Sequence, residues 1–162
     1  MCIRPESLVT TTAATEIRAI ASLVLLSGAA AFFRGFYDVD LVPGELIVAV
    51  QFTPVKSAAY AKLHQRASHY AIVGVAVALD VKGGVIQAAR AGLTGASTHA
   101  MRLTGVEQAL SGTKADGVAA AVARAADDAG DLNADLHASA DYRKAMIPVF
   151  VRRAVERALA RA

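Results

Sequence analysis

The clearest pattern in the chain is an alternation of large and small side chains over residues 72–81. This period of two predicts a β-strand with one bulky, packed face and one thin face. Lys82-Gly83-Gly84 predicts a tight turn, because glycine adopts positive φ at no steric cost. Residues 85–93 are expected to return as the partner strand. The large positions are Val73, Val75, Val77, Leu79 and Val81, and the small or polar ones are Gly74, Ala76, Ala78 and Asp80.

Upstream, the apolar segments are shorter and less regular. Residues 45–52, ELIVAVQF, follow a Pro43-Gly44 turn signal and predict a further strand, because they are rich in β-branched residues. Residues 20–26 predict one buried strand or short helix. Residues 55–70 are polar, and no strand is predicted there.

Downstream, the period changes to that of helices. Residues 103–110 predict a short helix, and the alanine-rich residues 114–129 predict a second one that Gly130 ends. Ser139 is a natural N-cap for a long last helix that contains Pro148. Strands followed by helices predict an α+β domain with helices on one side of a small antiparallel sheet. The apolar stripe of the last helix is Met146, Phe150, Ala154 and Ala158, broadened by Ile147, Val151 and Val155.

Composition narrows the class of protein. The 162 residues are 55% hydrophobic and 19% charged, which is enough apolar material for a real core. The net charge of +3 is too small to indicate nucleic-acid binding. Cys2, in a polar start over residues 1–14, is the single cysteine, which excludes an internal disulfide framework or multi-cysteine metal centre. A reducing compartment such as the cytoplasm is expected.

One apolar segment resembles a secretory signal. Residues 17–33 follow Arg4 and end near a run of alanines, but Glu16 and Arg18 flank the apolar part closely. The segment is too short for a transmembrane helix, so no membrane insertion is expected. Buried structure is the favoured interpretation, and an exported protein is the alternative.

The best candidate cluster for a ligand is Tyr60, Lys62 and Arg66. An aromatic ring stacks on a flat ligand, and a lysine neutralises a phosphate or a reduced ring. Taken locally, an ordinary amphipathic turn with solvated bases explains the cluster equally well. Residues 92–97, GLTGAS, are small enough for close backbone approach, but a strand-to-helix loop is the preferred interpretation.

Neither a catalytic triad nor a metal site is predicted. Ser68 has histidines nearby but no acidic residue spaced to orient them. His137 lies near Asp135 and Asp141, but the sequence offers no third ligand that must converge there. His64 and His69 are five residues apart, a spacing that suits neither a helix face nor a strand face.

Four segments in register resemble successive blocks of one family. They read AFFRGFYDVDLVPGELIVAVQFTP, YAKLHQRASHYAIVGVAVAL, AARAGLTGASTHAMRLTGVEQALSG and DLHASADYRKAMIPVFVRRAVERALA, and the resemblance covers roughly residues 31–162. The family is the FAD-binding medium subunit of molybdenum hydroxylases, of the carbon monoxide dehydrogenase and xanthine dehydrogenase type. The last three blocks resemble its C-terminal domain, and the first resembles the end of its FAD-binding domain.

The resemblance implies a fold and a function. The fold is α+β: a three-stranded antiparallel sheet packed against a three-helix bundle, preceded by a remnant of an FAD-binding domain. Residues 1–55 would be the truncated end of that domain, and residues 56–162 the C-terminal domain. The implied flavoprotein relays electrons from a small [2Fe-2S] subunit through FAD to an external acceptor, while a large molybdopterin subunit oxidises the substrate.

The resemblance also implies site residues. Tyr60 matches an aromatic residue against the flavin ring, Lys62 lies at or beside a lysine near the flavin, and Ile47 matches an apolar contact. Arg66 belongs to the motif with a structural role. In the last block, Ser139 matches a helix cap and Tyr142 a packing residue, and no catalytic residue is implied.

One departure from the family is large. The two glycine-rich segments with which the family grips the FAD diphosphate are absent from this sequence. The expectation is an incomplete FAD site, of which this chain supplies one wall. The alternative is a cofactor-free interaction module, or a non-functional truncated domain that has lost FAD binding. Exposed apolar surface would favour self-association.

Overall fold

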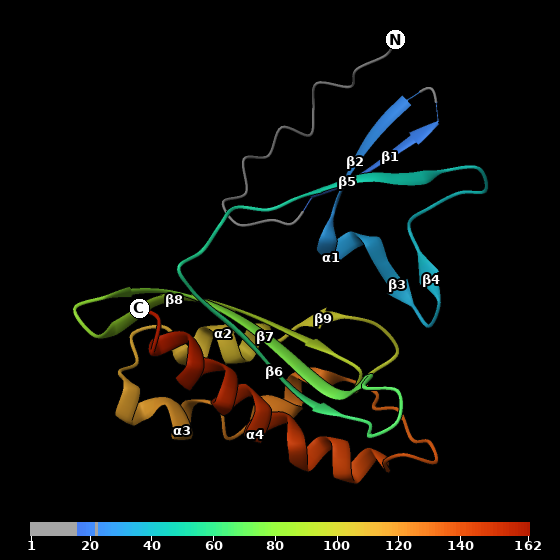
Figure 1. Ribbon diagram of the computed structural model, residues 1–162. Helices are drawn as coiled ribbons and strands as arrows, with labels where there is room; N and C mark the ends of the chain where they lie inside the picture. The colour runs from blue at the N-terminus through green and yellow to red at the C-terminus, as the bar shows by residue number, and fades with distance from the viewer. Residues whose placement is uncertain (1–15, 22) are drawn as a thin grey trace. The chain divides into compact units, whose positions relative to one another are not determined.

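The computed structural model describes residues 16–21 and 23–162, so Cys2 and the polar start over residues 1–14 lie outside the described residues. The chain divides into two compact units, one ending at Pro54 and the other spanning Val55–Ala162 (Figure 1). Among the helices that the structure describes, none combines the length and apolarity needed to span a bilayer.

The first unit is built around a three-stranded antiparallel sheet of order β2-β1-β5. The strand predicted at residues 45–52 is confirmed as β5, and Gly44 takes φ 92° in the turn before it. The single element predicted at residues 20–26 is wrong, because the chain reverses there and Ala21 pairs with Leu23. The elements are β1 (Glu16–Ala21), β2 (Leu23–Gly28), α1 (Ala29–Phe32), β3 (Phe33–Gly35), β4 (Asp38–Val39) and β5 (Leu46–Gln51).

The second unit contains a four-stranded antiparallel sheet of order β6-β7-β8-β9 (Figure 1). The predicted hairpin is confirmed: β7 is Ala71–Lys82, β8 is Val85–Thr94, and Gly83 and Gly84 join them at φ 59° and 76°. Two successive positive φ angles suit the right-handed twist of the strands, and glycine adopts them without strain. The sheet is larger than the expected three strands, because β9 (Met101–Arg102) pairs with β8.

The first strand of this sheet was not predicted. Residues 57–64 form β6 (Ser57–His64), which pairs along its length with β7. Its buried residues, Ser57, Ala59 and Ala61, are small, and the partly buried Leu63 is the one large apolar side chain on its core face, so the hydrophobic alternation is weak. Pairing with the strongly patterned β7 overrides the weak local signal.

The helices follow the sheet in the chain. Residues 103–110 contain the predicted helix as α2 (Thr104–Leu110), and α4 (Ala140–Leu159) begins where Ser139 accepts a hydrogen bond from the Tyr142 amide at 3.2 Å. The continuous helix predicted over residues 114–129 is wrong. That segment is broken into η2 (Ala115–Gly117), α3 (Val118–Ala121) and η3 (Ala125–Ala129), and Gly130 ends it at φ 58°.

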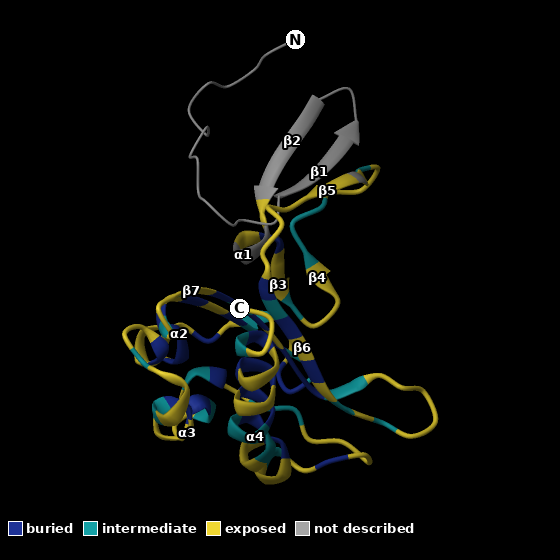
Figure 2. Cartoon of the chain, turned by 60° about the vertical axis from the view of Figure 1, so that its left-hand side comes forward, coloured by how far each residue is buried: buried dark blue, intermediate teal, exposed yellow. Residues whose placement is uncertain are grey.

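The core of the second unit lies between the helices and one face of the sheet. The odd positions of β7, Val73 to Leu79, are at most 3% exposed, as the alternation predicts. The buried stripe of α4 includes Ile147, Phe150 and Val151, while Met146 is only partly buried. In Figure 2 the helices carry buried residues toward the sheet and exposed residues away from it. Within the second unit, no described helix covers the opposite face of the sheet, which is called the open face below.

The outer edge of the sheet is strand β6, and α4 reaches it with two arginines. Arg157 donates a hydrogen bond to the carbonyl of Tyr60 at 3.2 Å, and Arg161 donates one to the carbonyl of Ala58. These carbonyls point away from β7, where a further strand would otherwise pair.

Candidate functional site

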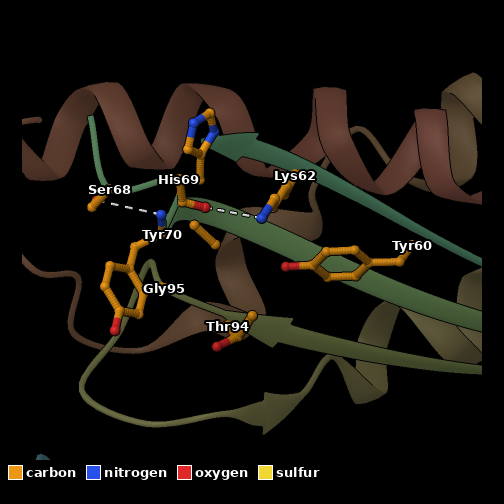
Figure 3. Close-up of a pocket in the computed structure, with 8 residues that line it drawn as sticks. Tyr60, Lys62, Ser68, His69, Tyr70, Thr94 and Gly95 are labelled. Carbon is orange, nitrogen blue, oxygen red and sulfur yellow. Dashed lines mark hydrogen bonds between the residues drawn. The ribbon is translucent and has the colours of Figure 1, made fainter. Parts of the chain in front are cut away.

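The open face of the sheet carries a pocket of about 470 Å³ at the end nearest the loop between β6 and β7 (Figure 3). It involves three strands and the two loops that follow β6 and β8. Its lining residues are Tyr60, Lys62, Ser68, His69, Tyr70, Ala71, Thr94 and Gly95.

Strand register explains why a hollow forms here. Lys62 pairs with Gly74, and Gly74 pairs with Thr94, so the three residues form one row across the sheet. Because Gly74 has no side chain, the row is empty at its centre. Tyr60 leans into this space: a Cβ at Gly74 would collide with the Tyr60 hydroxyl and lie 2.9 Å from the Thr94 methyl. Glycine in a strand interior often marks such a close approach.

Tyr60 is half-exposed, with one part packed on the sheet and the rest of the ring open to the pocket. Burial of the packed part raises the pKa of its phenol above the ordinary value, because the phenolate loses hydration there. The hydroxyl therefore stays protonated at neutral pH and keeps its donor.

Lys62 is held by the loop that follows its own strand. Its ammonium donates a hydrogen bond to the carbonyl of His69 at 2.9 Å, as the dashed line in Figure 3 shows. An ammonium has three donors, and among the described residues this is the single hydrogen bond that the Lys62 ammonium makes. The remaining donors are available to a ligand in the pocket.

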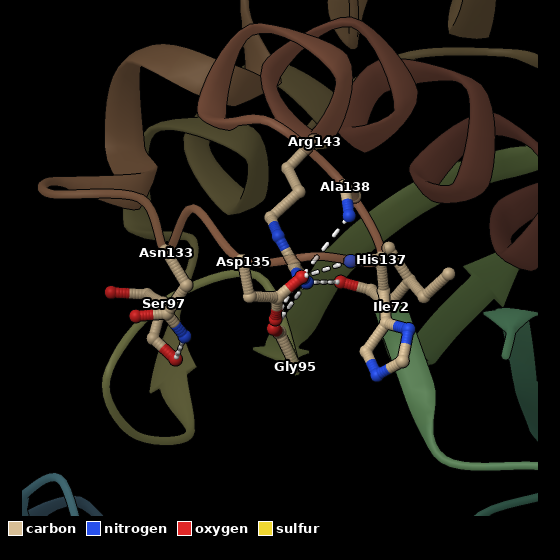
Figure 4. Close-up of polar contacts among 8 residues, drawn as sticks. All are labelled: Ile72, Gly95, Ser97, Asn133, Asp135, His137, Ala138 and Arg143. Carbon is tan, nitrogen blue, oxygen red and sulfur yellow. Dashed lines mark hydrogen bonds and ion pairs between the residues drawn. The ribbon is translucent and has the colours of Figure 1, made fainter. Parts of the chain in front are cut away.

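A buried arginine fastens the segments behind the pocket. Arg143, on α4 and 3% exposed, donates from one guanidinium nitrogen to the carbonyls of Ile72 (2.7 Å) and Gly95 (3.0 Å) (Figure 4). Its other terminal nitrogen pairs with Asp135 at 2.6 Å. Gly95, at φ 78°, has no room for a side chain, since a Cβ would collide with the Ala71 carbonyl. The arginine thus joins the start of β7, the end of β8 and the loop before α4.

The same cluster lowers the pKa of Asp135. Its carboxylate accepts hydrogen bonds from the amides of His137 (2.9 Å) and Ala138 (3.0 Å), and it faces the Arg143 guanidinium. The His137 amide, and then the Ala138 amide and Arg143, lower the pKa of Asp135 against the opposing effect of desolvation. The aspartate therefore stays charged and keeps Arg143 in place.

The structure brings together some of the residues predicted from sequence and not others. Tyr60 and Lys62 line one pocket, whereas Arg66 is exposed and does not line it. Ile47 lies in β5 of the first unit, 46% exposed. Tyr142, expected to pack, is 47% exposed.

Three of the four histidines have contacts that bear on the site. His64 and His69 stack with their ring centroids 5.4 Å apart, and the amide of His137 binds Asp135. Within residues 16–21 and 23–162, no group of three metal-ligating side chains converges.

Sequence reasoning missed several of the pocket's residues. The small segment at residues 92–97 was assigned to a loop, yet it supplies Thr94 and Gly95. The glycines and small residues of this segment were the one sequence signal that pointed to a ligand site there. Arg143 gave no signal, because a helical arginine is ordinarily solvated.

Comparisons with known proteins give the family of this chain. Residues 58–158 match the model of the CO dehydrogenase flavoprotein C-terminal domain. Over 136 residues the chain is 36% identical to the carbon monoxide dehydrogenase medium chain of Afipia carboxidovorans, covering 81% of this chain and 47% of that protein.

Solved structures of related enzymes also resemble this chain. A reconstituted CO dehydrogenase from Oligotropha carboxidovorans superposes with a TM-score of 0.82 at 30% identity, covering 91% of this chain and 54% of that one. Quinoline 2-oxidoreductase from Pseudomonas putida 86 gives 0.77 at 28% identity, covering 91% and 53%.

The chain spans about half the length of the relatives it matches. The family match covers more than half of its residues and includes every strand of the pocket except the first residue of β6. The chain therefore belongs to the family of the carbon monoxide dehydrogenase flavoprotein, the FAD-binding medium subunit, and contains the C-terminal domain of that family.

Proposed function

We propose that the open-face pocket is one wall of an FAD site, and that it faces the flavin ring. The observation that carries this proposal is the row of Lys62, Gly74 and Thr94 with Tyr60 leaning over its centre. It presents an aromatic ring and a cation side by side on one exposed surface. An aromatic ring can stack on the flat flavin ring, and a cation favours the negative charge that the ring gains on reduction.

Each residue has a distinct part. Tyr60 presents an aromatic ring, and its protonated hydroxyl remains a donor. Lys62 offers its remaining ammonium donors to ring oxygens and favours added negative charge. The missing side chain of Gly74 leaves room for the Tyr60 hydroxyl over the sheet and so sets how the Tyr60 ring lies at the pocket. FAD supplies the redox chemistry, because it accepts electrons singly or in pairs.

The pocket residues suit the flavin ring of FAD and not its diphosphate. The sequence contains neither of the family's two glycine-rich segments, and no other glycine-rich phosphate loop replaces them. The proposed contribution of this chain is therefore orientation of the ring. Ile47 is proposed as a further apolar contact, and the first unit as the end of an FAD-binding domain.

The family also supports a role in a larger enzyme. We infer that the chain is part of a flavoprotein that takes electrons from a small [2Fe-2S] subunit and passes them to an external acceptor. A large molybdopterin subunit would oxidise the substrate. The cytoplasm is the proposed compartment.

The experiment is reconstitution from two polypeptides. The chain is co-purified with a second polypeptide that carries the two glycine-rich segments of a related medium subunit, and bound FAD is measured by its visible absorbance. We expect little FAD on the chain alone and a clear rise in the pair. Tyr60→Ala should weaken FAD binding about tenfold, the effect of losing roughly 1–1.5 kcal/mol of stacking.

The chain offers matched controls for both residues. Tyr142 is exposed to nearly the same extent as Tyr60, 47% against 46%, but does not line the pocket, so Tyr142→Ala should leave FAD binding unchanged. Lys82→Ala is the matched control for Lys62→Ala, because Lys82, the last residue of β7, is exposed and does not line the pocket. If the pair assembles without FAD, the cofactor-free interaction module becomes the better interpretation. Equal losses in Tyr60→Ala and Tyr142→Ala would remove this pocket as the flavin wall.

A further inference from the structure

The lysine of the pocket is fixed in place by a single main-chain carbonyl. Lysine has a flexible four-carbon stem, and ordering it costs side-chain entropy. Here the ammonium is tied to the carbonyl of His69, at 2.9 Å, across the loop that joins β6 to β7. The direction of that one carbonyl therefore decides where the charge of Lys62 lies.

The backbone of His69 has an unusual conformation. Its φ is 58°, in the left-handed region that residues other than glycine seldom adopt. Only Tyr37 shares this property among the described residues other than glycine. Asparagine, aspartate and histidine tolerate the region better than other side chains, whereas a β-branched residue strongly disfavours it.

The rest of the loop is built to hold this conformation. The amide of His69 donates to the carbonyl of Gln65, and the amide of Gln65 donates to the carbonyl of Tyr70, both at 2.9 Å. The side-chain oxygen of Gln65 accepts from the amide and hydroxyl of Ser68, at 2.6 and 3.0 Å. The imidazole of His69 stacks on that of His64, with 21° between the ring planes. The loop is thus closed on itself, with the His69 carbonyl as its contact with Lys62.

We propose that His69 is a positioning residue that acts through its main chain: its left-handed backbone directs a carbonyl to Lys62 and fixes the ammonium at the pocket. The imidazole supports the loop but does not contact Lys62. The link to flavin binding rests on the function proposed above, whereas the link between His69 and Lys62 stands on the geometry alone.

The test compares substitutions that all remove the imidazole but differ in backbone preference. His69→Gly and His69→Asn retain the left-handed conformation, and His69→Val opposes it. Lys62 is probed in the whole chain by reductive methylation with formaldehyde and a borohydride reagent, followed by mass spectrometry. Exposed Lys82 serves as the internal standard.

We expect His69→Val to raise the methylation rate of Lys62, relative to Lys82, about three- to fivefold, as the release of an exposed hydrogen bond of ordinary strength would. His69→Gly and His69→Asn should stay within about twofold of the wild type, since both keep the carbonyl in place. An equal rise in all three variants would assign the effect to the imidazole and overturn the proposal. No rise in His69→Val would overturn it as well.

Folding and function are checked separately. Circular dichroism verifies that each variant is folded. If His69→Val does not fold, His69→Ala replaces it, and Lys62 should then be methylated faster in His69→Ala than in His69→Gly. In the two-polypeptide reconstitution, His69→Val should weaken FAD binding as Lys62→Ala does, while His69→Asn should not. If Lys62 reactivity follows the backbone but Lys62→Ala leaves FAD binding unchanged, the proposed function fails and the positioning by His69 stands.

Discussion

The two units of the chain differ in how they treat large apolar side chains. In the second unit, the apolar positions of β7 and α4 are buried against each other, and the core is continuous from Ala59 to Ala158. Among the first unit's residues whose burial is described, several large apolar ones lie on the surface. They include Phe36 (67% exposed), Leu46 (69%), Val50 (52%) and Phe52 (70%). A soluble unit rarely leaves so many large apolar residues on its surface without a partner to cover them.

This difference shows where the stability of the chain resides. The second unit has a sheet, a covering helix layer and a buried ionic cluster of its own. The described part of the first unit has a sheet of six-residue strands and short elements, with Phe32 as its one buried apolar side chain among residues whose burial is described. We therefore expect the second unit to fold by itself and the first to depend on it or on a partner.

The largest expected effect comes from separating the units. A polypeptide of residues 55–162 should unfold cooperatively, with a midpoint within about 5 °C of the whole chain, because it keeps the complete core. A polypeptide of residues 1–54 should show no cooperative transition. Circular dichroism melts test both. A cooperative transition in residues 1–54 alone would erase the contrast between the units.

The second prediction compares the effect on stability of truncating two isoleucines, one in each unit. Ile147 is fully buried in α4, and Ile47 is 46% exposed in β5. Ile147→Ala should lower the free energy of unfolding by about 2–5 kcal/mol, because it leaves a cavity in the core. Ile47→Ala should cost less than about 1 kcal/mol, because a partly exposed side chain loses little burial. Urea titrations measure both values, and equal costs would show that both units share one core.

The smallest effect is a pH dependence confined to the second unit. The folded-state pKa of Asp135 is lowered, so its contribution to stability is complete above the ordinary aspartate pKa of about 3.9 and is lost as the pH falls through the lower folded value. Asp135→Asn should reduce stability at neutral pH by about 1 kcal/mol, because the buried Arg143 guanidinium loses its counter-charge, while solvent screens the half-exposed carboxylate. The difference from wild type should vanish in acid. Melts from pH 7 downwards test this, and a difference that persists below the folded pKa would contradict it.

The sequence predicted the parts of the fold in which local pattern and tertiary structure agree. The odd positions of β7 are large because they face the core, and Gly83 and Gly84 form the turn that their φ angles require. Strand β6 escaped prediction because most of its inward residues are small and its outward residues are polar. The broken segment at residues 115–129 escaped because alanine favours a helix wherever packing does not interrupt it.

The site could be predicted only in part. Resemblance to a family pointed to Tyr60 and Lys62, which line one pocket. The roles of Gly74 and Thr94 arise from register across three strands, which a single sequence does not specify. The left-handed backbone of His69 and the buried hydrogen bonds of Arg143 depend on contacts between segments far apart in the chain.

The two arginines that reach β6 have a consequence for how copies of the chain meet. An open sheet edge invites a second chain to extend the sheet, which is a common first step toward aggregates. At β6 the outward carbonyls of Ala58 and Tyr60 already accept hydrogen bonds from α4. A visiting strand would have to displace these guanidinium groups before it paired. Pairing at β6 is therefore disfavoured, and the exposed apolar residues of the first unit are the expected surface for association between copies.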